Sequence, residues 1–204
     1  MYQSHHSLRL ITAASLLALG ACSQPAPAPL VEGSWTLDST ASDLSFVTVK
    51  AGNVGEAHGF KGLSGSVTPE GLATLAVDLA TVDTGVDIRD ERMRDVLFEV
   101  GTHPQAKVSA QLDPASLSAL AVGESKTMPV KATLDLHGTS SEIETQLDVV
   151  RTGADTVLVI TTRPIILDAT AFGLGEGVEK LRNLAQLPAI STAVPVTFRL
   201  TYSR

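Results

Sequence analysis

Residues 130–137, VKATLDLH, decide the fold class of this chain. Apolar and polar side chains alternate along them without a break, and a β-strand places successive side chains on opposite faces of its sheet. Val130, Ala132, Leu134 and Leu136 would share one face, while the polar residues between them would share the other. The stretch therefore predicts a strand with one face turned to an apolar interior.

The same alternation recurs along the chain. It is clear in residues 73–80 (ATLAVDLA), 142–149 (EIETQLDV) and 194–202 (VPVTFRLTY). Turn-forming residues separate many of the stretches, and short links between long strands indicate antiparallel pairing. Eight or nine such strands need two packed sheets or a closed barrel. Weaker strands are expected at residues 34–38, 43–50, 60–67, 106–112 and 156–167.

Two segments follow a helical period instead. Residues 87–98 (DIRDERMRDVLF) carry an apolar stripe, and Asp87 with Asp90 resembles a capping box at the start of a helix. Residues 176–187 (EGVEKLRNLAQL) also predict a helix, and Pro188 is expected to end it. The first helix would interrupt the series of strands midway, and the second would precede the last strand.

The composition indicates one globular domain. The chain has 204 residues, of which 44% are hydrophobic and 18% charged, and it can form a core without disulfides. Its formal net charge is −7 at pH 7, and no cluster of Lys and Arg stands out. An acidic surface repels phosphate backbones, so nucleic acid is not expected as a partner.

The N-terminus has the order of a secretory signal peptide. Arg9 precedes a short apolar run, which is too short for a comfortable transmembrane helix, and small residues follow it. The tetrad Leu19-Gly20-Ala21-Cys22 resembles a bacterial lipobox, in which the cysteine is lipidated and becomes the first residue of the mature protein. The alternative is an ordinary signal peptide with a chance cysteine.

This interpretation divides the chain into three parts. Residues 1–21 would be the signal peptide, 22–33 a Pro/Ala-rich tether and 34–204 the domain. Cys22 is the sole cysteine, and a cysteine-free body fits an oxidising compartment. Since Ser23, not Asp, follows the cysteine, we expect a periplasmic protein anchored to the outer membrane.

No catalytic, metal or cofactor motif stands out. His58, His103 and His137 lack the spacing of a zinc-ligand pair, so no metal site is predicted. Ser64 does not lie in a G-x-S-x-G elbow. The glycines of residues 173–177 precede a helix but lack a βαβ unit, so no dinucleotide cofactor is expected.

A set of short motifs runs in order through most of residues 34–202. They are Trp35-x-x-Asp38 with Ser42-x-x-x-Phe46, Phe60 with Gly65, Val82-Asp83-Thr84, Arg89-Asp90 with Met93, Leu97-Phe98 with His103-Pro104, and Leu134-x-Leu136-x-Gly138. In this order and spacing, the motifs resemble the YceI-like family of bacterial periplasmic lipid-binding proteins.

The resemblance implies an all-β fold, an eight-stranded antiparallel lipocalin-like β-barrel with two short flanking α-helices. Its elongated apolar cavity would hold an isoprenoid or a similar long-chain amphiphile, and a barrel of eight strands is wide enough for one small ligand. Alternation alone favours a solid core instead, because protein interiors are normally close-packed. The expected ligand-binding residues are Leu44, Phe46, Phe60, Val77, Leu79, Phe98, Leu134, Leu136, Leu147, Phe172 and Phe198.

Arginines on the first predicted helix admit two interpretations. Arg89 or Arg92 could cover the mouth of a cavity and pair with a polar headgroup. Alternatively, each pairs with the neighbouring acids Asp90, Glu91 and Asp95 on a solvated face, and this second interpretation is favoured for any single arginine.

Three functions follow from these observations. The first is binding or carriage of a lipophilic molecule, such as a polyisoprenoid, an isoprenoid quinone or a fatty-acid derivative, in the periplasm, without enzymatic activity. The second is an enzyme acting on such an amphiphile, with Asp83, Asp87 or Asp90 near the cavity mouth. The third is a structural envelope lipoprotein with a solid core. The oligomeric state is left open.

Overall fold

The computed structural model describes residues 1, 29 and 32–204. The predicted signal peptide, Cys22 and most of the predicted tether lie outside the described residues. Among the described residues, no helix has the length and apolar character needed to cross a membrane.

Twelve strands occupy the described part of the chain, and every pairing between them is antiparallel. Their bounds are β1 Trp35–Leu37, β2 Asp43–Lys50, β3 Val54–Phe60, β4 Leu63–Val67, β5 Leu72–Asp78, β6 Val82–Asp83, β7 Gln105–Gln111, β8 Ser125–Leu136, β9 Thr139–Gly153, β10 Thr156–Thr161, β11 Ile165–Asp168 and β12 Ala193–Ser203.

Eight of these strands form a closed ring. The order β1-β4-β5-β7-β8-β9-β10-β12 runs around the wall, and β12 pairs back with β1 through Thr36↔Ser203 and Leu37↔Tyr202. The predicted eight-stranded antiparallel barrel is therefore confirmed. Closure leaves these strands without a free edge, which protects the wall from pairing with other chains.

The other four strands extend the wall at one end. The C-terminal half of β12 pairs with β1 and β10, whereas its N-terminal half pairs with β2 and β11. Beyond β2, the sheet continues through β3 to β6. No pairing within the described residues joins β6 to β7, so the ring of strands is open on this side at this end.

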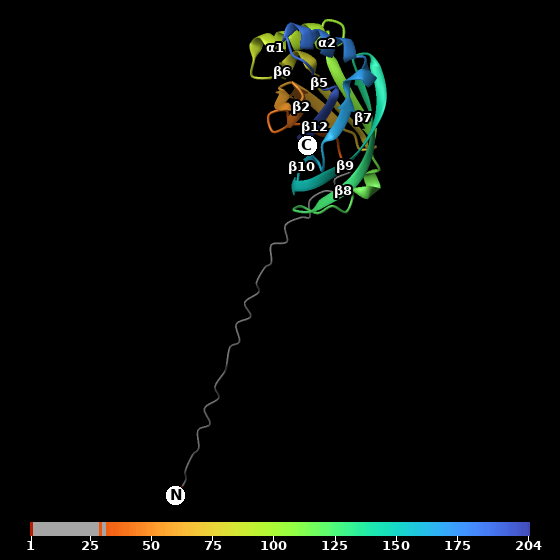
Figure 1. The fold of residues 1–204 in the computed structure, drawn as a ribbon. Coiled ribbons are helices and arrows are strands. Elements are labelled where there is room, and N and C mark those ends of the chain that lie inside the picture. The colour runs from red at the N-terminus through yellow and green to blue at the C-terminus, as the bar shows by residue number, and fades with distance from the viewer. Residues whose placement is uncertain (2–28, 30–31) are drawn as a thin grey trace.

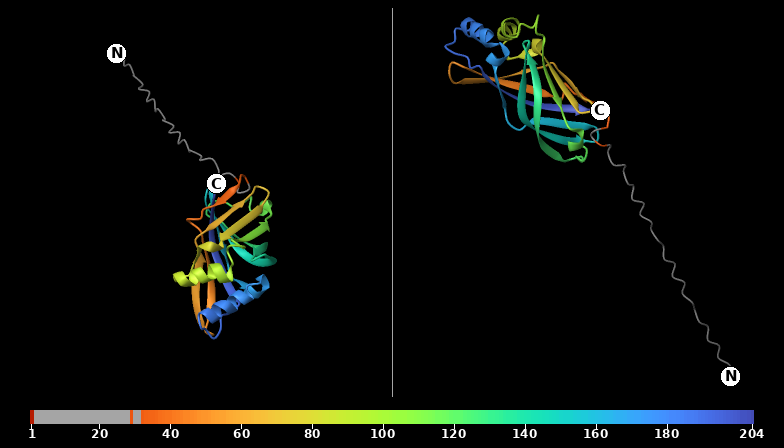
Figure 2. Two further views of the ribbon diagram at one scale, coloured as in Figure 1. Left: turned by 90° about the horizontal axis from the view of Figure 1, so that it is seen from above. Right: turned by 90° about the vertical axis from the view of Figure 1, so that its right-hand side faces the viewer.

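Helices cover the same end of the barrel. They are α1 Asp87–Arg92, the π-helical turn η2 Met93–Leu97 and α2 Gly175–Leu184, and Figures 1 and 2 show them gathered away from the C-terminus. A Cβ on Gly177 would lie 3.1 Å from Leu97 Cα, so α2 packs on η2 more closely than most side chains would allow. Three short 3-10 turns complete the fold: η1 Leu79–Thr81, η3 Pro114–Ser116 and η4 Ala169–Phe172.

The alternating stretches behave as the sequence predicts. Val130, Ala132 and Leu134 of β8 are buried, while Lys131 and Thr133 between them are exposed. The barrel interior is thus built from one face of each strand, and the opposite faces meet solvent.

Two strand predictions were wrong in their bounds. Residues 60–67 are not one strand, because β3 ends at Phe60 and β4 begins at Leu63. The N-terminal part of β3 was missed because VGEAHGF has glycines and polar residues where apolar ones are expected. Residues 156–167 likewise divide into β10 and β11, which pair with different halves of β12.

The helix boundaries also differ from expectation. The capping box was wrong: Val86 occupies the N-cap of α1 without a side-chain cap, and Asp90 instead accepts hydrogen bonds from Thr84 N (2.9 Å) and Thr84 Oγ1. The second helix ends at Leu184, before Pro188, because the backbone turns into the left-handed region at Gln186 (φ 54°).

Candidate ligand-binding cavity

The barrel encloses a cavity of about 580 Å³. Ligand pockets in proteins commonly range from about 300 to 1,000 Å³. Close-packed interiors contain few voids larger than a water molecule, so this interior is not the solid core that alternation alone favours. All eleven apolar residues predicted to bind a ligand line the cavity: Leu44, Phe46, Phe60, Val77, Leu79, Phe98, Leu134, Leu136, Leu147, Phe172 and Phe198. Their contact with a ligand stays a prediction.

Aromatic rings follow one another along part of the wall. The ring centroids of Phe46 and Phe60 are 5.3 Å apart, and those of Phe60 and Phe98 are 5.9 Å apart. These residues come from β2, from β3 and from the end of η2, so the row leads from the barrel wall to the helical cover. Such a row offers a continuous apolar surface to a long hydrocarbon chain.

A small group of charged residues interrupts this apolar lining at the helical end. Glu56 Oε2 lies 2.8 Å from both Lys50 Nζ and Arg89 Nη1, and Arg89 Nη2 donates to Thr84 O at 2.8 Å. Lys50, Glu56 and Arg89 all line the cavity. We call these three residues, with His58 beside them, the polar ledge.

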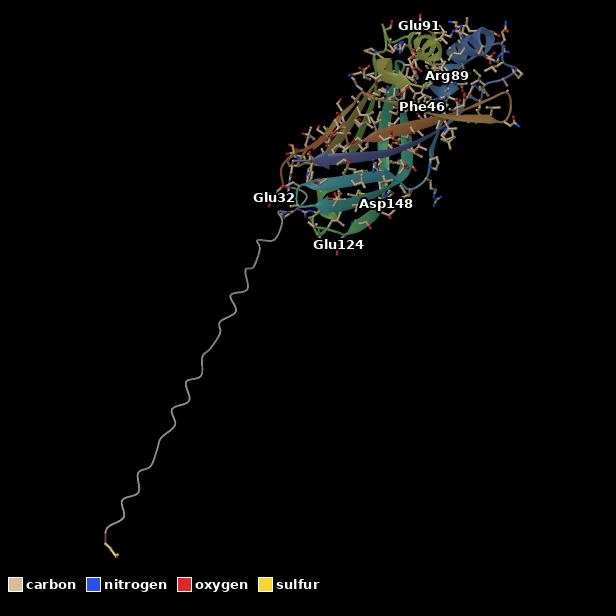
Figure 3. The ribbon with its side chains drawn as sticks, turned by 90° about the vertical axis from the view of Figure 1, so that its left-hand side faces the viewer. Glu32, Phe46, Arg89, Glu91, Glu124 and Asp148 are labelled. Carbon is tan, nitrogen blue, oxygen red and sulfur yellow. The ribbon has the colours of Figure 1, made fainter. Side chains whose placement is uncertain are left out.

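Arg89 lies on the side of α1 that faces the barrel, whereas Glu91 lies on the outer side of the helix (Figure 3). The favoured interpretation, that Arg89 pairs with acids on its own helix, was therefore wrong. The carboxylate that holds it comes from β3, a strand 33 residues earlier, and only the folding of α1 over the barrel end brings the two together.

His58 is the functional candidate that sequence reasoning missed. It is 5% exposed, lines the cavity, and shares a 2.9 Å hydrogen bond between its Nε2 and Thr48 Oγ1. Burial, followed by the nearby Arg89 charge, lowers the pKa of His58 below its ordinary value of 6.5. The imidazole is therefore neutral at neutral pH.

A signal for His58 did exist in the sequence. Glu56, His58 and Phe60 alternate with the small residues Gly55, Ala57 and Gly59, which puts the three larger side chains on one face. All three line the cavity. The pattern was overlooked because the inward face of this strand begins with polar rather than apolar residues.

Two polar atoms of the ledge are buried without hydrogen-bond partners in the described structure. They are His58 Nδ1 and Arg89 Nε. Buried polar atoms are nearly always hydrogen-bonded, since leaving one unpaired costs about 1–3 kcal/mol. Both atoms therefore leave hydrogen-bonding capacity at the ledge, which a water molecule or a polar group of a bound molecule would use.

Other exposed residues near α1 connect the cavity with the surface. Val86 and Ile88 line it and are 44% and 52% exposed. Arg92 also lines the cavity, and its side chain makes no ion pair within the described part of the chain. The cavity thus reaches solvent beside α1, at the end where the strands are open.

The acids proposed for catalysis do not reach this cavity. Asp83 pairs with Lys61 at 2.8 Å, Asp90 is buried against Thr84, and neither these two nor Asp87 is part of the lining. The carboxylates of Asp83 and Asp90 serve local structure before and at the start of α1. One carboxylate, Glu56, and one imidazole, His58, are on the lining within the described residues, and Glu56 is held by two cations.

Comparisons with known proteins agree with this geometry. The model of the YceI-like domain family matches residues 35–202. A search of curated proteins gives no significant match. A polyisoprenoid binding domain from Saccharophagus degradans, implicated in plant cell wall breakdown, is 47% identical with a TM-score of 0.81, covering 83% of this chain and 97% of that domain.

Two more distant structures show the same fold. BcnA from Burkholderia cenocepacia is 20% identical with a TM-score of 0.60, covering 81% of this chain and 98% of its own. The YceI protein of Campylobacter jejuni is 13% identical with a TM-score of 0.51, covering 72% of this chain and 84% of its own. At these identities the likeness supports the barrel architecture alone.

Proposed function

The chain belongs to the YceI-like family, and from this premise we propose that its barrel binds a long-chain lipophilic molecule, foremost a polyisoprenoid. The observation that carries the proposal is the apolar cavity of about 580 Å³ inside the closed barrel. The related domain from Saccharophagus degradans is a polyisoprenoid binding domain, and 47% identity supports a ligand of the same class.

The size of the cavity supports a long chain. At roughly 30 Å³ for each water-sized group, it holds about twenty such groups. A single ring would leave most of the apolar wall without contacts, whereas an extended prenyl or alkyl chain would cover it. An isoprenoid quinone or a fatty-acid derivative would satisfy the same wall, and the polyisoprenoid is preferred because of the relative.

The polar ledge gives the ligand a direction. We place the polar head beside His58 and Arg89, whose unpartnered atoms would bond to it, and the tail along Phe46 and Phe60 into the barrel. Lys50, Arg89 and Arg92 outnumber the single acid Glu56 on the lining, so a head with negative charge or strong acceptor groups is favoured.

We propose a binding protein rather than an enzyme. Catalysis by a general acid and base needs groups free to exchange protons with the substrate. Glu56 is held by Lys50 and Arg89, and hydrogen bonding to Lys50 is the largest cause that lowers its pKa. Carriage or buffering of the lipophilic molecule requires neither Glu56 nor His58 to react.

We place this activity in the periplasm, with the protein tethered by a lipid on Cys22 to the outer membrane. The tetrad Leu19-Gly20-Ala21-Cys22 supports the anchor, and the residues up to the barrel would hold the cavity off the bilayer. Membrane and lipophilic ligand are then the two expected partners.

Extraction of the purified chain with organic solvent, followed by mass spectrometry, tests the proposal. We expect a prenyl compound, or another long-chain lipid, in stoichiometric amount. Leu134→Lys places a charge in the apolar interior, where Leu134 is 5% exposed, and should abolish retention. Thr133→Lys, on the exposed face of the same strand, is the matched control and should retain the ligand.

Leu134→Ala guards against misfolding of the lysine variant. In a solid core this change destabilises by about 2–5 kcal/mol whether or not ligand is present. In the proposed cavity, the loss of stability in the ligand-free protein is smaller and ligand occupancy falls. Wild-type protein without extractable lipid, or a large loss of stability indifferent to ligand, would overturn the proposal.

A further inference from the structure

A second cluster of polar residues lies outside the cavity lining. Glu99, His103 and His137 come within reach of one another, each offering one ligand atom, and these atoms all lie within 4.8 Å of each other. His137 Nε2 is 3.3 Å from Glu99 Oε2, and the two imidazole centroids are 4.4 Å apart. We propose that these three residues bind a divalent transition-metal ion, with Zn²⁺ as the best fit.

The ligand set suits zinc. Imidazole nitrogen and carboxylate oxygen are both common zinc ligands, with bonds of about 2.0–2.2 Å. Tetrahedral geometry then separates neighbouring ligand atoms by about 3.3 Å, which is the distance already present between His137 Nε2 and Glu99 Oε2. The side chain of Glu99 is 51% exposed, so its carboxylate is free to move as the ion enters.

A buried nitrogen points to the same conclusion. His137 Nε2 is shielded from solvent and makes no hydrogen bond within the described residues, although Glu99 lies close, because the geometry does not suit one. A neutral imidazole nitrogen with a free lone pair is a metal ligand, and buried ring nitrogens otherwise find a hydrogen-bond partner.

The backbone gives an independent observation. Four described residues other than glycine have positive φ, and Glu99 (49°) and His137 (51°) are two of them. In the turn between β8 and β9, His137 and Gly138 both have positive φ, a conformation for which Asn-Gly is the preferred pair. Histidine and glutamate therefore stand where other residues fit the backbone better, as is common at functional sites.

The position of the cluster suggests what the ion does. Glu99 follows η2, His103 precedes β7, and His137 lies in the turn between β8 and β9, where a Cβ on Gly173 would be 3.7 Å from its Nδ1. A bound ion would tie the helical cover to the barrel rim. If the proposed lipid binding holds, the ion would also slow exchange of the ligand past this cover.

Zinc binding by the full chain, purified without an added histidine tag and stripped with a chelator, tests the inference. Isothermal titration with Zn²⁺ alone should give one site per chain, and Co²⁺ should give the visible absorption of a tetrahedral site. His137→Asn is the informative variant, because Asn-Gly keeps the turn while the imidazole is lost. It should weaken zinc binding at least tenfold.

Glu99→Gln and His103→Gln should weaken zinc binding in the same way, whereas Glu142→Gln, which removes an exposed carboxylate on β9, should leave it unchanged. Absence of a stoichiometric site, or zinc binding that survives both histidine substitutions, would overturn the inference. Lipid retention measured on the same preparations keeps the two proposals apart, since zinc binding does not require the lipid.

Discussion

His58 shows how its surroundings decide the chemistry of one residue. On β3 it pairs with Phe46, packs against that ring at 5.3 Å, and shares a hydrogen bond with Thr48. These neighbours remove water from the imidazole, and the Arg89 charge further disfavours its protonation. A residue that would titrate near neutral pH in water is thereby kept neutral in the folded protein.

This lowered pKa predicts a loss of stability in mild acid. In the unfolded chain His58 binds a proton near pH 6.5, while in the folded protein it does so at lower pH. The contribution of His58 to the free energy of unfolding is therefore fully present above pH 6.5. It is lost as the pH falls toward the folded pKa, at up to ~1.4 kcal/mol per pH unit. Urea unfolding at pH 7.5 and 5.5 measures this loss, and His58→Gln should reduce the difference in unfolding free energy between the two pH values. An equal difference in both proteins would contradict the expectation.

The backbone conformation at position 71 requires a glycine. It has φ of +89°, and a Cβ there would collide with the carbonyl oxygen of Leu112, whose amide bonds to Gly71 O at 2.9 Å. Gly71→Ala should lower the free energy of unfolding by about 1–3 kcal/mol through backbone strain. Gly55→Ala is the control, because no atom lies within 4 Å of its added Cβ. Equal midpoints of thermal unfolding for the two variants would exclude the strain argument.

At the scale of elements, the strands are well specified and α1 is not. Strands such as β8 carry the alternation that their burial requires. Helix α1 begins at Asp87 without a side-chain cap and passes into the π-helical turn η2 after six residues. A weakly capped helix beside the cavity opening would suit a segment that moves when the proposed ligand enters.

A cap introduced at Val86 should stabilise this helix. Val86 has the extended backbone of an N-cap (φ −138°), and Val86→Ser would offer a hydroxyl to the free amides of the first turn. We expect a gain of about 0.5–1 kcal/mol in unfolding free energy. Ile88→Ser removes a similarly exposed apolar side chain inside the helix and should give no gain. If both variants have the same midpoint of thermal unfolding, capping does not account for a change in stability.

At the scale of the whole molecule, the closed barrel has two ends that carry different features. The helical cover, the polar ledge and the opening beside α1 lie at one end, and the C-terminus lies at the other (Figure 2). Glu32 and Glu124 also lie at this second end, whereas Arg89 lies at the first (Figure 3). A tether entering at Glu32 would therefore leave the cavity opening facing away from its point of attachment.

Anchoring by Cys22 predicts a change of location. Cys22→Ser removes the thiol that would carry the lipid, so the protein should leave the membrane fraction or stay unprocessed. Fractionation of cells with either form, followed by mass measurement of the N-terminal peptide, decides between the two results. A substitution of Ser23, which leaves the thiol intact, is the control for processing. A Cys22→Ser protein that is still processed and membrane-bound would contradict the lipobox interpretation.

The sequence by itself determined the local structure. Alternation placed β8, β9 and β12, turn residues separated them, and an ordered set of motifs indicated the family and its barrel. All of these signals depend on near neighbours in the chain, and side-chain periodicity is a property of the strand itself.

Only the tertiary structure decided how the interior is used. Alternation cannot distinguish a cavity from a solid core, because both need the same apolar face, and the difference lies in the volume that closure leaves unfilled. Glu56 and Arg89, and likewise Glu99 and His137, are more than thirty residues apart and meet only across the barrel end. No local sequence pattern indicates these contacts, since each depends on the register of every strand between its two residues.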